Sequence, residues 1–189
     1  MKPKLSIQSS PWGAVQSQNL RAPGLVFVST ASHGGYNLTA DRWAHLMREM
    51  PDFQSFAGDG WLEEDCDACA VYALWPDEFE PCAVFHAVRF AFSAQSWATA
   101  AGSMSRFLAR GSDAAKRARL IADEFRASVA DHWETGSLCT CRGGLSVTMR
   151  HVTTREAREI IFPDYPKKQF YTASELDGFK PALVKGGAQ

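Results

Sequence analysis

The spacing of apolar residues changes along this chain, and those changes limit the folds open to it. Residues 24–30 (GLVFVST) form a short β-rich run that ends in the polar SHGG, which predicts a buried strand. Residues 36–38 predict a short returning strand. Between about residues 40 and 132 the apolar side chains instead recur every three or four positions, which predicts helices. From Leu145 onward the spacing becomes two, which predicts half-buried strands.

Three segments of the central part are predicted as its first helices. Residues 40–50 place their apolar side chains on one face and follow Thr39, a residue type that suits an N-cap. Residues 62–74 begin with acidic residues, which favours a helix N-terminus there, although a strand through ACAVYALW (68–75) stays open. Residues 81–92 fit both helix and strand, and we favour a helix entered through Asp77.

Two longer helices are expected next, over about residues 94–110 and 113–132. Gly111 suits the end of the first helix, and Ser112 suits the N-cap of the second. The residues expected to face inward are Trp97, Ala101, Met104 and Leu108 in the first helix and Leu120, Ile121, Phe125 and Val129 in the second.

The carboxyl-terminal part predicts β-structure followed by a loose end. Residues 158–162 and 168–172 are expected as strands joined by the turn PDYP, and the tail from Lys180 is expected to be flexible. We therefore predict a single α+β domain over residues 1–189, with an ordered core of about 10–179. In this domain the central helices pack against one small, mainly antiparallel sheet built from the amino- and carboxyl-terminal segments.

Composition favours a protein of the cytoplasm. The 46% apolar and 22% charged residues are typical of a globular chain. No apolar run approaches the roughly 20 residues that cross a bilayer, so we expect no membrane contact. The two lysines near the amino terminus have no apolar stretch behind them, so no secretory signal is predicted. Five cysteines, an odd number, favour a reducing compartment over a disulfide framework.

The net charge of −1 conceals a strong asymmetry along the chain. The segment from Glu49 to Val88, called here the acidic segment, has ten acidic residues and no Lys or Arg, whereas the rest has twenty basic against eleven acidic residues. The acidic segment therefore carries −10 and the remainder +9. Either basic helices elsewhere in the fold balance these acids, or the acids form a surface that meets a basic partner. The residues expected on such a surface are Asp59, Glu63, Glu64, Asp65, Asp67, Asp77, Glu78 and Glu80.

The familiar catalytic motifs are missing from the sequence. It contains no GxxxxGK[ST] phosphate loop, no GxGxxG after a strand, no HExxH and no GxSxG. One weaker candidate is His33, which follows a predicted strand and precedes Gly34 and Gly35. It could act as a general base while the glycine amides bind an anion. Alternatively, His33 caps a tight turn by hydrogen bonding and the glycines supply positive φ, and we favour this structural role.

A second candidate is the dense acidic run that begins at Glu63. Glu63 and Asp67 would share one face of a helix, while Glu64 points elsewhere. Two such carboxylates with His33 could hold a divalent metal for hydrolysis. The alternative is that these acids simply complement a helix dipole.

Two cysteine pairs raise the question of a zinc site. Four thiolates could come from Cys66-x-x-Cys69 and Cys139-x-Cys141. The first pair falls in a predicted helix, and the second pair has only one intervening residue, so neither has the setting of a zinc knuckle. We expect no metal site and no cofactor.

Two unusual strings give the chain a resemblance. VSTASHGGYNLT (28–39) and GWLEEDCDACAVYALWPDEF (60–79), preceded by SPWG (10–13), resemble an uncharacterised family carried by bacterial plasmids, integrated elements and phages. Its members show PWG, STASHGG and WYEEDCDWA strings, and the likeness covers roughly residues 10–80. The chain departs from the pattern at Leu62, where the family has Tyr, and in reading EEDCDAC, so Cys69 does not belong to the pattern.

The resemblance implies residence on mobile elements but no established activity. Small proteins of such elements often disarm host defence by presenting acidic surfaces. Our first hypothesis is therefore an inhibitor of a host defence complex, of the anti-CRISPR or anti-restriction type, that binds a basic protein surface through its acidic segment. The alternative is a metal-dependent hydrolase or nuclease that uses His33 with Glu63, Glu64 or Asp67. We do not expect direct nucleic-acid binding through the basic residues near Lys116, because acidic residues interrupt them.

Overall fold

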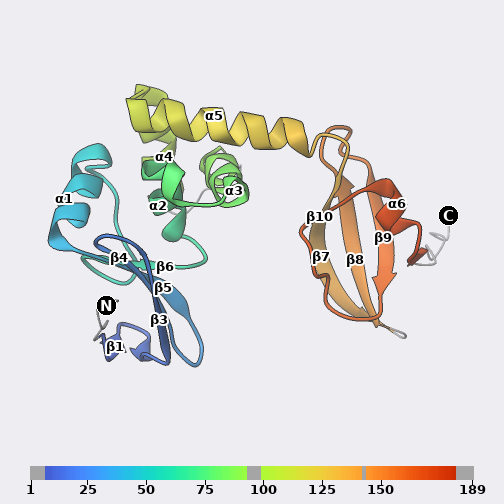
Figure 1. The fold of residues 1–189 in the computed structure, drawn as a ribbon, viewed down its shortest axis with the longest axis horizontal. Helices are drawn as coiled ribbons and strands as arrows, with labels where there is room; N and C mark the ends of the chain where they lie inside the picture. The colour runs from blue at the N-terminus through green and yellow to red at the C-terminus, as the bar shows by residue number, and fades with distance from the viewer. Residues whose placement is uncertain (1–6, 93–98, 142–143, 182–189) are drawn as a thin grey trace. The chain divides into compact units, whose positions relative to one another are not determined.

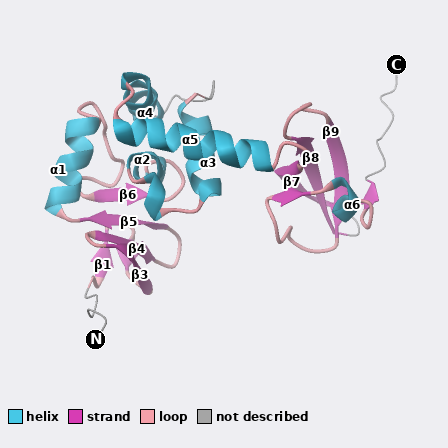
Figure 2. Ribbon diagram, turned by 45° about the horizontal axis from the view of Figure 1, so that its top comes forward, coloured by secondary structure: helices cyan, strands magenta, loops and turns pink. Residues whose placement is uncertain are grey.

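A computed structural model describes residues 7–92, 99–141 and 144–181. Helices and antiparallel sheets occur in separate stretches, which confirms the predicted α+β class (Figures 1 and 2). The chain divides into two compact units, Met1–Phe125 (unit 1) and Arg126–Gln189 (unit 2), each described by itself below. That the whole chain acts as one domain stays a prediction. Within the described residues, no helix is both long and apolar enough to span a membrane.

Unit 1 contains a four-stranded antiparallel sheet. Its strands lie in the order β3-β4-β5-β6 and comprise Ser17–Ala22, Leu25–Ser29, Gly34–Leu38 and Trp61–Glu63. Phe27 of β4 lies opposite Tyr36 of β5, and Tyr36 lies opposite Leu62 of β6, so these three side chains share one face. The strands predicted at residues 24–30 and 36–38 are confirmed as β4 and β5, and β3 was not predicted.

A small hairpin precedes this sheet. Its strands, β1 (Ser9–Ser10) and β2 (Gly13–Ala14), have two residues each, and Trp12 lies in the turn between them. The side-chain amide of Gln18 in β3 bonds both the N–H and the C=O of Ile7 at 3.3 Å, which ties the residue ahead of the hairpin to the sheet.

The helices of unit 1 share one hydrophobic core with the sheet. They are α1 (Ala40–Glu49), α2 (Ala68–Leu74), the 3-10 helix η1 (Pro76–Glu78), α3 (Pro81–Ala91), α4 (Thr99–Arg110) and α5 (Asp113–Ser128), which ends beyond the unit boundary. Leu25, Tyr36, Leu38 and Leu62 contribute the sheet's side of this core. Because these residues alternate along their strands, a single face of the sheet is buried against the helices.

Most predicted helices are present, and their boundaries correct several details. Thr39 occupies the N-cap of α1 but forms no side-chain capping bond, whereas Ser112 does cap α5 through the amide of Ala115. The helix predicted over residues 81–92 is α3, which starts after Glu80 with Pro81 at its first position, while Asp77 lies in η1.

Two expected side-chain placements need comment. Leu120 was expected to face inward, but 49% of its surface is exposed because α5 buries its alanines and Ile121 instead. Trp97, expected on the inner face of α4, lies outside the described residues.

The helix predicted over residues 62–74 is wrong in its first half. Trp61–Glu63 is a strand, a turn follows, and the helix starts only at Ala68. Leu62 is fully buried opposite Tyr36, so this segment pairs with β5 as a strand of the sheet and does not form a helix. The Glu63 carboxylate then accepts hydrogen bonds from the amides of Asp65 and Cys66, which stabilises the turn.

Unit 2 is a five-stranded antiparallel sheet with one short helix. The strands lie in the order β10-β7-β8-β9-β11 and comprise Phe170–Tyr171, Trp133–Cys141, Gly144–His151, Ala157–Phe162 and Lys180–Pro181. Helix α6 (Ala173–Leu176) begins with a capping box between Thr172 and Glu175. Trp133, Val147, Met149, Ile160 and Leu176 belong to a separate core.

The prediction of one sheet built from both ends of the chain is wrong. The amino- and carboxyl-terminal strands form different sheets, because consecutive hairpins pair strands locally and each sheet has a core of its own. Strand β7, which includes the segment GSLCTC, was not predicted. The tail predicted to be loose from Lys180 starts with β11, which pairs with β9, and its residues 182–189 lie outside the described part.

Candidate functional site

Three separate segments meet around strands β5 and β6 of unit 1. Trp12 packs its indole edge-on against that of Trp61, with ring centroids 5.8 Å apart. A Cβ atom at Gly35 would fall on Cη2 of Trp12 and within 2.5 Å of the Leu62 carbonyl oxygen. The indole of Trp12 therefore lies directly against the backbone of β5, in a place that only glycine leaves open. The PWG, SHGG and WLEEDCD strings thus converge in space.

Gly34 plays a related part on the other face of β5. Its N–H donates to Glu64 Oε1 at 2.9 Å, and the Glu64 N–H donates to the Gly34 carbonyl at 3.1 Å. A Cβ atom at Gly34 would fall on the Glu64 carboxylate and 2.8 Å from the ring of Phe27. Neither Gly34 nor Gly35 has a positive φ, so the turn role predicted for them is wrong, and close approach explains both glycines.

The turn before β5 is fixed by Thr30. The Thr30 hydroxyl donates to the His33 carbonyl at 3.0 Å and accepts from the His33 amide at 3.1 Å. The Thr30 amide also donates to the His33 carbonyl, at 2.8 Å. The turn thus uses the backbone of His33 and leaves the imidazole ring to other contacts, which corrects the predicted capping role of that ring.

The structure brings His33 and Glu63 together. His33 Nδ1 lies 3.9 Å from Glu63 Oε1, with the histidine side chain 51% exposed and the glutamate side chain 15% exposed. Burial raises the pKa of Glu63, while the hydrogen bonds from the Asp65 and Cys66 amides lower it. The pair is a partly exposed acid–base contact at the end of β6.

Asp67, unlike this pair, is fully buried. Its Oδ2 accepts hydrogen bonds from Ser55 Oγ at 3.0 Å and from the Phe56 amide at 2.9 Å. Its Oδ1 has no hydrogen-bond partner in the described part of the chain. Burial raises the pKa of Asp67 against these hydrogen bonds, which lower it. Because Asp67 is inaccessible, it is not part of the predicted partner-binding surface. Its carboxylate instead holds the Ser55 hydroxyl and the Phe56 amide in place.

Several other acids of the acidic segment are paired with arginines from outside it. Arg117 holds Asp77 at 2.7 Å, Arg42 holds Glu78 through two hydrogen bonds of 2.8 and 2.9 Å, and Arg106 contacts Asp52. The interpretation that basic helices balance the acids therefore applies to these positions. The acids that stay exposed without such a cation among the described residues are Asp59, Glu64, Asp65 and Glu80.

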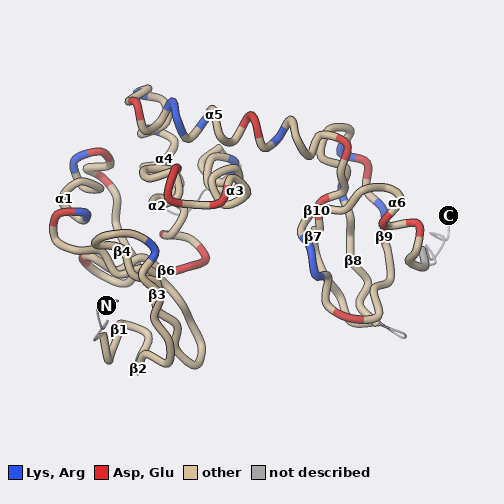
Figure 3. The backbone as a smooth tube through the Cα atoms, viewed as in Figure 1, with Lys and Arg blue, Asp and Glu red and all other residues tan. Residues whose placement is uncertain are grey.

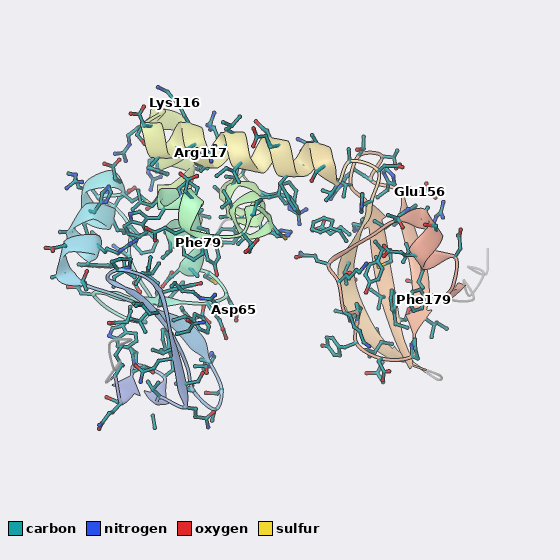
Figure 4. All side chains as sticks on the ribbon, in the orientation of Figure 1. Asp65, Phe79, Lys116, Arg117, Glu156 and Phe179 are labelled. Carbon is teal, nitrogen blue, oxygen red and sulfur yellow. The ribbon has the colours of Figure 1, made fainter. Side chains whose placement is uncertain are left out.

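The exposed acids are concentrated near β6. Figure 3 shows one acidic stretch between β6 and α2 and another between α2 and α3. Asp59 precedes β6 and Asp65 follows it, so the two carboxylates flank a strand of three residues. Figure 4, in which Asp65 is labelled, shows this residue at the margin of unit 1.

The cysteines of this region are poorly suited to metal or redox chemistry. Burial, followed by Glu63, Asp67 and Asp65, raises the pKa of the Cys66 thiol, and burial raises the pKa of Cys69 to about 12. The second predicted pair belongs to unit 2, and the side chain of Cys141 lies outside the description. Among the described residues, no three His, Cys, Asp or Glu side chains are arranged to hold a metal ion.

We expect Cys69 to react at least about 100-fold more slowly with iodoacetamide than the exposed Cys139 at pH 8. With a pKa of about 12, only about one Cys69 thiol in 10,000 is ionised at that pH, and the thiolate is the reactive form. The measurement uses two variants that each keep only one of these cysteines. Unfolding in urea should bring their rates together, and equal rates in the folded variants would contradict the assignment.

Two residues of the site escaped the sequence-based prediction. The contact of Trp12 with Gly35 was signalled only by the co-occurrence of the PWG and SHGG strings. Phe56, with 66% of its surface exposed, was not singled out, because no local pattern distinguishes an exposed phenylalanine from a core residue.

Comparison with known proteins places the chain in a family. No curated protein and no solved structure matches it. Residues 6–159, which include every segment of the site, match the profile of a domain of unknown function, DUF7007. The chain therefore belongs to the DUF7007 family.

Proposed function

We propose that this chain is an accessory protein of mobile genetic elements that inhibits a host defence complex by binding a basic protein surface. The observation that supports it best is the exposure of Asp59, Glu64 and Asp65 around β6, none of which contacts a Lys or Arg among the described residues. Uncompensated surface carboxylates of one sign attract a basic partner and speed its association.

The class of target follows from the same charge argument. Protein channels that hold DNA or RNA are lined with Lys and Arg, because these residues neutralise phosphates. A surface bearing exposed carboxylates can occupy such a channel and exclude the nucleic acid. A CRISPR effector or a restriction complex in the bacterial cytoplasm fits this description, and the resemblance to a family of plasmids and phages supports the choice.

One contact favours the alternative of a hydrolase. His33 Nδ1 approaches Glu63 Oε1 to 3.9 Å, as a general base and its orienting carboxylate would. However, Glu63 already accepts two amide hydrogen bonds, and Asp67 is committed to Ser55 and Phe56. We therefore rank binding above catalysis.

The test expresses the protein in bacteria with an active CRISPR or restriction system and counts plaques of a targeted phage. The wild-type chain should raise the plaque count, and the double reversal Asp59→Lys/Asp65→Lys should remove at least about 90% of that rise. Both side chains are exposed, so the variant should keep its fold. In purified form, binding should weaken as the Debye length falls from roughly 10 Å at 0.1 M salt to about 3 Å at 1 M.

The matched control is Asp123→Lys/Asp164→Lys, which makes the same charge change at exposed acids outside the acidic segment. It should leave the plaque count within about twofold of the wild-type value. If no defence system is inhibited, or if both double reversals act equally, the proposed function is wrong. If His33→Ala alone removes the rise in plaque count at an unchanged Tm, the result would support the hydrolase instead.

A further inference from the structure

The aromatic ring of Phe56 is largely exposed to solvent, although the nearby ring of Phe53 is buried. Phe56 exposes 66% of its surface, whereas Phe53, three residues earlier in the same loop between α1 and β6, exposes 2%. Burying an aromatic ring is strongly favourable, so a ring left in water beside a buried one has no part in the core of this chain.

The backbone on both sides of Phe56 is fixed by buried groups. Its own amide donates to Asp67 Oδ2 at 2.9 Å, and the next amide, that of Ala57, donates to Ser55 Oγ at 3.1 Å. The Ser55 hydroxyl also contacts the Trp61 carbonyl of β6. Turning this backbone inward would break the hydrogen bond to a fully buried carboxylate, so the loop keeps the Phe56 side chain on its solvent side. A loop backbone that is already ordered loses little conformational entropy on binding.

The charges around Phe56 select the class of partner. Asp67 joins the Phe56 loop directly to the turn that contains Asp65, and Asp59 lies three residues further along the loop. These acids repel the phosphates of nucleic acids and the headgroups of anionic lipids. A protein surface with an apolar pocket bordered by Lys or Arg would bury the Phe56 ring and pair with the carboxylates.

We propose that Phe56 is the aromatic anchor of the binding surface, inserting into an apolar pocket of a partner protein while Asp59 and Asp65 face basic residues at the pocket's rim. The inference rests on the proposed function for the identity of the target, and it adds which residue contributes most to affinity. Interfaces concentrate their binding energy in a few central aromatic residues surrounded by polar ones, which is the arrangement here.

The experiment places the photoreactive residue p-benzoylphenylalanine at position 56 of the full chain, in bacteria that contain a defence system and are infected by phage. The control has the same residue at position 165, where Tyr165 is 72% exposed in unit 2. We expect a protein adduct at position 56 that exceeds the control at least about tenfold, with the adduct mapped to an apolar site next to Lys or Arg. The double reversal Asp59→Lys/Asp65→Lys should abolish the adduct.

With the captured protein in hand, Phe56→Ala should weaken its binding by about 30-fold or more, whereas Tyr165→Ala should change it less than about twofold. Both variants should keep the wild-type Tm, since both rings are exposed. No excess adduct at position 56, an adduct with nucleic acid or lipid, or an unchanged affinity of Phe56→Ala would overturn the proposal. An excess adduct with a basic protein outside any defence system would keep the anchor and refute only the proposed target.

Discussion

Replacing Gly35 by alanine is expected to destabilise the protein by about 3 kcal/mol, at the upper end of the usual cost of overpacking. The added methyl group would overlap Cη2 of Trp12 and lie 2.5 Å from the carbonyl oxygen of Leu62. The indole can shift only by leaving Trp61, and the carbonyl belongs to the β5–β6 ladder. Urea unfolding followed by circular dichroism, with the m-value checked for constancy, measures the loss.

The same chemical change at Gly102 provides the control. In α4 the nearest atoms that a methyl group at this position would meet among the described residues belong to the guanidinium of Arg106, at 3.5 Å, which is ordinary contact. Gly102→Ala should therefore stabilise the protein by about 0.5–1 kcal/mol, because alanine favours helices over glycine. Adding Trp12→Ala to Gly35→Ala should cost less than the two single changes combined, since the first removes one obstacle to the second. Additive losses would show that the indole does not occupy the gap.

Asp67→Ala is expected to cost about 2–3 kcal/mol, whereas Asp67→Asn should cost clearly less at pH 7. Alanine would leave the amide of Phe56 without a hydrogen-bond acceptor and remove a hydrogen-bond partner of Ser55. Asparagine keeps an acceptor for the Phe56 amide. The same asparagine oxygen, in the place of Asp67 Oδ2, can also accept from the Ser55 hydroxyl, and the side chain carries no charge into the interior.

The pH dependence isolates the charge of Asp67. Burial raises its pKa in the folded protein, so the folded state binds the proton more tightly than the unfolded state. The stability due to protonated Asp67 is fully present below about pH 3.9, the ordinary range of an aspartate, and is lost as the pH rises through the raised folded pKa. The wild-type free energy of unfolding should therefore fall relative to that of Asp67→Asn above pH 4 and then level off.

Unfolding in urea at intervals from pH 4 to pH 8 tests this difference. Glu63, whose pKa is also raised, changes stability with the same sign. Because burial is the largest cause of that raised pKa and is common to both proteins, most of its contribution cancels, and only the part due to the charge of Asp67 is lost in Asp67→Asn. Parallel curves for the wild type and Asp67→Asn would mean that the buried carboxylate is ionised without penalty.

The spacing of apolar residues correctly predicted those helices and strands whose buried residues follow from their own local sequence. The helix at residues 40–50 buries one face, and the strand at residues 24–30 is a short apolar run with buried residues on both faces, so the local pattern alone was sufficient. The failure at residues 62–74 has a nonlocal cause, because Leu62 pairs with Tyr36 and the Glu63 carboxylate binds the amides that follow it. Separate sheets also could not be predicted, since strand pairing depends on cores that no short segment specifies.

The candidate site was predicted only in part. The strings around His33 and Glu63 indicated which residues to compare, and the structure brings these two together. The acidic segment, by contrast, predicted too large a surface, because Asp67 is buried and Arg42 and Arg117 neutralise acids on η1. Charge counted along a sequence cannot show which acids fold beneath the surface or beside a cation.

The contacts that build the site join residues 12 to 67, and this has a consequence for how the protein forms during synthesis. The longest of these contacts, between Trp12 and Trp61, spans 49 residues, and the entropy of loop closure grows only slowly with such lengths. Trp12, Gly35, Trp61 and Asp67 all emerge from the ribosome before α3, so the strands of this sheet can begin to pair while α3, α4 and α5 are still being translated.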